Sequence, residues 1–118
     1  MTTNARNQQK PVDDAFIAEH DKAVLELVQN ILAAAMHKTA TGSHYVVVNY
    51  YGQVNHLDVY ADTADDEQYN DATYQPGSAL KRTSLPLLPY FGAEQPDRTD
   101  YALIQQELHD LLQQILEL

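Results

Sequence analysis

The chain has 118 residues and no cysteine, so it is long enough for one hydrophobic core and cannot form a disulfide or a cysteine-based zinc site. Seventeen acidic residues face seven basic ones, and the formal net charge of −10 repels nucleic-acid phosphates and anionic membranes. We therefore expect a protein of a reducing compartment, the cytoplasm by default, that binds neither nucleic acid nor a membrane directly.

The first eleven residues are polar and show no periodicity. They lack the apolar stretch of a signal peptide, and no apolar run in the chain approaches the roughly 20 residues that cross a bilayer. Segments of this composition cannot bury enough apolar surface to offset the entropy lost on ordering. We expect a flexible tail over 1–11 and a single α+β domain over 12–118.

A long amphipathic helix is predicted from Val12 to about Lys38. Asp13 or Asp14 can cap its first turn, and Gly42 follows as a stop signal. Apolar residues recur at spacings of three and four, which is typical of a helix with one buried face. These residues are Ile17, Val24, Leu27, Ile31 and Ala34, with Val28 and Ala35 widening the stripe.

Residues 43–61 predict a β-hairpin, because Tyr, Val and Leu are dense on both sides of Gly52-Gln53. A two-residue turn with glycine first is the type II′ arrangement. That turn would pair Tyr51 with Val54, Val48 with Leu57, Val46 with Val59, and Tyr45 with Tyr60.

This register sorts the hairpin side chains onto two faces. One face would carry Val46, Val48, Leu57 and Val59, which can pack on helices. The other would carry Tyr45, Val47, Asn49, Tyr51, Val54, His56, Asp58 and Tyr60. Tyrosine is enriched in binding surfaces, so the partner-binding candidates on this second face are Tyr45, Val47, Tyr51, His56 and Tyr60. The alternative is that another segment of the chain, such as residues 87–91, covers the same face.

An acidic stretch follows over 62–76 and predicts a long loop. Its candidate partner-binding carboxylates are those of Asp62, Asp65, Asp66 and Glu67, and the alternative is a merely solvated charge run. Residues 78–85 could form a third strand, and the nearby Pro86 and Pro89 favour an edge position for it.

A second helix is predicted to start between Pro96 and Asp100 and to run to the last residues. Tyr101, Ile104, Leu108, Leu111, Ile115 and Leu118 alternate spacings of three and four, as in a heptad repeat. The candidate self-association residues are Leu108, Leu111, Ile115 and Leu118. The alternative is that the same stripe packs inside its own domain.

No catalytic, metal-binding or cofactor-binding motif is present in the sequence. The four glycines form no phosphate-binding loop, and no nucleophile motif occurs. The five histidines lack the i, i+4 spacing of helical metal sites; they are His20, His37, His44, His56 and His109. We therefore expect no catalytic residue, no metal and no cofactor.

These observations favour a non-enzymatic acidic protein-interaction module that self-associates as a homodimer, through the last helix or the tyrosine face. One alternative is an inhibitor of a nucleic-acid-binding protein or nuclease that presents carboxylates as a DNA mimic to a basic partner. Another is a metal-binding protein or small enzyme that uses the hairpin histidines and the acidic loop.

Overall fold

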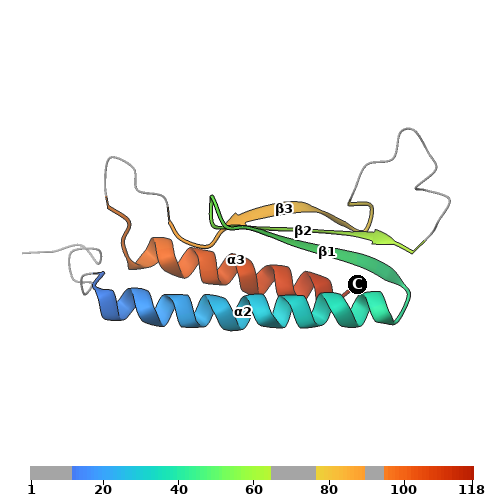
Figure 1. Cartoon of the computed structure of the whole chain (residues 1–118), viewed down its shortest axis with the longest axis horizontal. Coiled ribbons are helices and arrows are strands. Elements are labelled where there is room, and N and C mark those ends of the chain that lie inside the picture. The colour runs from blue at the N-terminus through green and yellow to red at the C-terminus, as the bar shows by residue number, and fades with distance from the viewer. Residues whose placement is uncertain (1–11, 65–76, 90–94) are drawn as a thin grey trace, which may run out of the picture.

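The computed structural model of the protein describes residues 12–64, 77–89 and 95–118. Its elements are helix α2 (Asp14–Ala40), strands β1 (His44–Tyr51), β2 (His56–Thr63) and β3 (Leu80–Pro86), and helix α3 (Arg98–Leu116). The strands form one antiparallel sheet in the order β1-β2-β3. The two helices pack on each other and on the same side of the sheet (Figure 1). The α+β prediction is confirmed, and the predicted tail over 1–11 lies outside the described residues.

Both helices begin at an aspartate that caps them. The Asp13 carboxylate accepts a hydrogen bond from the amide of Phe16 at 2.8 Å. At α3, Asp97 accepts from the amide of Asp100 at 3.1 Å, and the Asp100 carboxylate accepts from the amide of Asp97 at 2.8 Å. These bonds satisfy amides that the helix itself leaves without a partner. Helix α2 continues two residues past the predicted end at Lys38.

The core lies between the two helices and the inner face of the sheet. Its buried residues from the helices are Val24, Ile31, Ala34, Ile104, Leu108, Leu111 and Ile115, and those from the sheet are Leu57, Val59, Ala61 and Leu80. The heptad stripe of α3 therefore has α2 on one side and the sheet on the other.

The hairpin turn differs from the prediction. A four-residue loop from Gly52 to Asn55 joins the strands, and the Asn55 amide donates to the Gly52 carbonyl at 3.4 Å. Asn55 has a positive φ of 51°, a left-handed conformation that asparagine tolerates better than most residues. The predicted two-residue turn at Gly52-Gln53 is therefore wrong.

The longer loop shifts the strand register by two residues. The observed pairs are Tyr51 with His56, Val48 with Val59, Val46 with Ala61, Tyr45 with Asp62, and Val47 with Tyr60. All four predicted pairs are wrong. Because side chains alternate with a period of two, a shift of two residues leaves each strand residue on its predicted face.

Strand β3 pairs with β2 and lies at an edge, as the prolines indicated. Two residues of β3 are basic, Lys81 and Arg82, and the strand ends at Pro86. The other edge strand, β1, contains no proline and no Asp, Glu, Lys or Arg.

Candidate functional site

The sheet has an outer face that, within the described part of the chain, no helix covers (Figure 1). It carries all five predicted partner-binding residues: Tyr45, Val47, Tyr51, His56 and Tyr60. Tyr45 and Tyr51 are 41% and 45% exposed, and the other three are half-buried. The structure therefore brings the predicted set together on one surface.

An ion pair formed by Arg82 and Asp58 lies on this outer face. The Arg82 Nη2 atom is 2.9 Å from Asp58 Oδ2, and Nε donates to Asp58 Oδ1 at 3.0 Å. The hydrogen bond and the negative charge of Asp58 raise the pKa of Arg82 above its ordinary value. The Arg82 guanidinium also lies 5.7 Å from the centroid of the Tyr60 ring. Tyr60 is therefore engaged within the chain, and Tyr51 also interacts with Arg82 through a side-chain hydrogen bond that contributes to the raised pKa of Arg82.

The predicted acidic residues are placed only in part. Asp62 lies in β2 and is 2% exposed, and its Oδ1 atom accepts hydrogen bonds from the amides of Gly77 and Ser78, each at 2.8 Å. Its carboxylate organises the chain that enters β3 and is not presented outward. Asp65, Asp66 and Glu67 lie outside the described residues, so the DNA-mimic hypothesis stays a prediction.

The residues predicted for self-association through the last helix lie in the core of their own chain. Leu108, Leu111 and Ile115 are at most 2% exposed, and Leu118 is half-buried against the same core. Leu108, Leu111 and Ile115 therefore offer almost no surface to another molecule.

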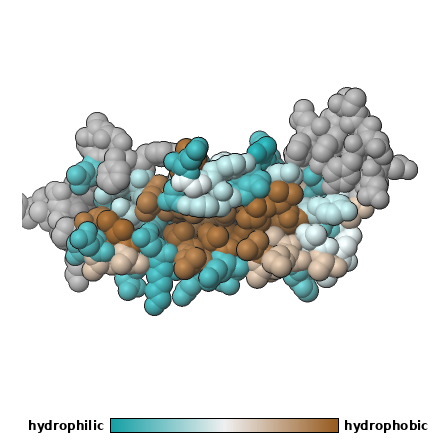
Figure 2. All heavy atoms as spheres, viewed as in Figure 1, coloured by the Kyte–Doolittle hydropathy of each residue, from teal (hydrophilic) through white to brown (hydrophobic). Residues whose placement is uncertain are grey.

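A second apolar surface lies along α2 beside β1, and the sequence analysis missed it. Its exposed members are Leu25, Leu32, Met36 and Tyr50, between 48% and 64% exposed, and the half-buried Val28, Val46 and Val48 lie beside them. We call these seven residues the α2–β1 surface. Figure 2 shows apolar side chains gathered across the middle of the viewed face, between α2 and the sheet. The sequence signal was present: Leu25, Leu32 and Met36 follow one another at helical spacings of seven and four, beside the predicted stripe.

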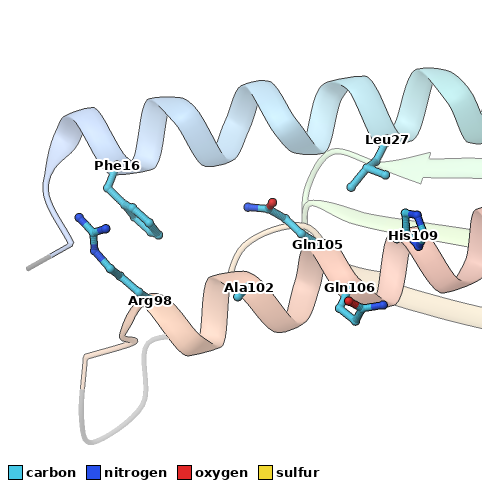
Figure 3. A pocket seen from close by; sticks show the side chains of 7 residues that line it. All are labelled: Phe16, Leu27, Arg98, Ala102, Gln105, Gln106 and His109. Carbon is cyan, nitrogen blue, oxygen red and sulfur yellow. The ribbon is translucent and has the colours of Figure 1, made fainter. Parts of the chain in front are cut away.

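A groove runs between α2 and α3 on the side away from the sheet (Figure 3). Its described lining residues are Phe16, Leu27, Arg98, Ala102, Gln105, Gln106 and His109. The Arg98 guanidinium lies 4.3 Å from the centroid of the Phe16 ring. Gln106 donates to Asp110 at 2.8 Å. Among these described lining residues, His109 is the only side chain that could act as a nucleophile.

His20 is 1% exposed and joins three segments of the fold. Its Nε2 atom lies 3.0 Å from the Leu87 carbonyl, which can only accept, so Nε2 carries the proton. Nδ1 then accepts from the Gln105 amide, also at 3.0 Å. The ring makes an edge contact with Tyr101, with 4.8 Å between ring centroids. The structure therefore gives His20 a structural role in the interior.

The described residues contain no group of three or more His, Asp and Glu side chains that could hold a metal ion. Neither of their helices has the length and apolarity needed to span a bilayer. Comparison of the chain with protein-family models, curated proteins and solved structures found no match.

Proposed function

We propose that the chain is a non-enzymatic protein-interaction module that binds another protein chain through the α2–β1 surface. The observation that carries the proposal is the exposure of four large apolar side chains side by side on one face. Contiguous apolar patches are uncommon on monomers and mark interaction sites when polar residues surround them. The surrounding residues of α2 include the charged Asp21, Lys22 and Glu26.

The chemistry of the surface supports a protein partner over a small molecule. None of its seven residues carries a charge, and Asp21 lies at the border. A small-molecule site usually combines apolar walls with a few convergent polar groups in a deep pocket. The α2–β1 surface instead runs along a helix and a strand, which suits a second extended protein surface.

Photo-crosslinking in cells that produce the chain tests this function. A photoreactive benzoylphenylalanine in place of Leu32 is expected to form a covalent adduct with a protein. The matched control is the same residue in place of Leu103, which is 56% exposed on α3 and outside the surface. Equal adduct formation at 32 and 103, or none at 32, would contradict the proposal.

A further inference from the structure

The two edges of the sheet are protected differently. An open edge strand can pair with another chain, and proteins commonly block it with charged residues or proline. Strand β3 has Lys81 and Arg82, ends at Pro86, and has irregular pairing with β2 near Val59 and Ala61. Strand β1 is an eight-residue edge without such a residue. Within the described residues, no strand pairs with the free side of β1.

The hydrogen bonds show which β1 residues face this free side. The Ser43 carbonyl accepts from Ala64 on the β2 side, whereas the Val46 amide donates away from β2, to Thr39 Oγ1 at 3.2 Å. Because backbone groups alternate along a strand, Val48 and Tyr50 also direct their amide and carbonyl to the free side. The Val46 amide already donates to the Thr39 hydroxyl. The open part of the edge therefore consists of the backbone groups of Val48 and Tyr50, and Asn49 lies at its centre.

The apolar residues of α2 follow the same open stretch. Leu25 lies beside Tyr50, and Leu32 lies beside Val48. Suppose that a second copy pairs its β1 strand antiparallel with this one and places its Tyr50 opposite Val48. The α2 helix of that copy would then place its Leu25 opposite Leu32. One antiparallel arrangement of two copies therefore pairs the open edges of both β1 strands and brings the exposed leucines of both α2 helices together.

We propose that the occupant of the α2–β1 surface is a second copy of this chain. Two β1 strands pair antiparallel about a twofold axis at Asn49, and the two three-stranded sheets become one of six strands. Val48 of each copy exchanges backbone hydrogen bonds with Tyr50 of the other. The two α2 helices lie antiparallel beneath the joined strands and bury Leu25 and Leu32 against each other.

The lack of charge on the α2–β1 surface and its area suit a second copy. A chain with a net charge of −10 can approach itself most easily on an uncharged face, and the α2–β1 surface has no charged residue. Its exposed side chains and the valines beside them offer on the order of 500 Å² per copy. A symmetric pair would bury on the order of 1,000 Å², at the lower bound for a specific interface.

Sedimentation velocity on the purified chain tests this inference, which rests on the proposed function. The wild type is expected to have a sedimentation coefficient that corresponds to twice the mass of the chain. The Leu32→Glu variant is expected to sediment as a monomer and to keep the circular dichroism spectrum of the wild type. Leu103→Glu, which adds the same charge on α3, should remain a dimer. A wild type that is monomeric at every concentration would overturn the inference. A cellular adduct at position 32 with a different protein would in that case still support the proposed function.

Disulfide formation tests the register, because the natural chain has no cysteine. Directly opposite residues of a non-hydrogen-bonded antiparallel pair have Cα atoms about 4.5 Å apart, within the range of a disulfide. Asn49→Cys should therefore form a covalent dimer under mild oxidation. In this register Val47 faces Tyr51 of the other copy, so Val47→Cys should not. A disulfide at 47 without one at 49 would overturn the arrangement.

Discussion

At the scale of single residues, His20 connects α2 to the segment after β3 and to α3 through its two ring nitrogens. His20→Phe keeps an aromatic ring but leaves the Leu87 carbonyl and the Gln105 amide without that partner. We expect the free energy of unfolding to fall by about 3 kcal/mol, the typical cost of leaving buried polar groups unsatisfied. Urea denaturation measures this loss.

His109→Ala provides the matched comparison for His20, because His109 is exposed on α3. It should change the free energy of unfolding by less than about 0.5 kcal/mol. Equal losses in the two variants would show that the hydrogen bonds of His20 contribute little. The sequence could not identify this role, because the partners of His20 lie 67 and 85 residues away and a lone histidine leaves no spacing pattern.

At the scale of elements, the hairpin shows how far a local pattern can be interpreted. The alternation of apolar residues predicted both strands and both faces correctly, since faces depend only on a period of two. The turn was assigned from Gly52, but the positive φ in this loop belongs to Asn55. Gly52 and Asn55, three positions apart, both suit turns, so the sequence leaves the loop length ambiguous and the predicted pairs were displaced.

Substitutions at Asn55 test this turn directly. Asn55→Ala should lower the free energy of unfolding by about 1 kcal/mol, because alanine is disfavoured at positive φ. Asn55→Gly should remain closer to the wild type, since glycine adopts that conformation without steric cost. Both variants remove the hydrogen bond from Tyr50 to Asn55. Equal losses in urea denaturation would therefore attribute the cost to that bond and not to the backbone.

The last helix illustrates a different limit of prediction from the sequence. Its spacing correctly predicted that Leu108, Leu111 and Ile115 are buried. Spacing cannot tell which surface covers a stripe, and here α2 and the sheet of the same chain do so. On α2 the sequence predicted the buried stripe but not the exposed apolar residues beside it. Leu25, Leu32 and Met36 are exposed in the structure, and the sequence analysis gave them no role.

At the scale of the whole molecule, the net charge of −10 opposes association of two copies, while the proposed contact is apolar. Added salt screens repulsion between the copies and leaves apolar burial intact. The dimer dissociation constant should therefore decrease as salt rises from low to physiological concentration, as measured by sedimentation equilibrium. Binding of acidic side chains to a basic partner, as in the DNA-mimic hypothesis, would weaken under the same change.

The basic residues and terminal proline of β3 would limit the size of the proposed assembly. When two copies share their β1 strands, the outermost strands of the joined sheet are the two β3 strands. Lys81, Arg82 and Pro86 make that border a poor template for another chain. In the proposed dimer, growth into a fibre would thus be blocked at both borders of the joined sheet, and pairing through β1 would end at two copies.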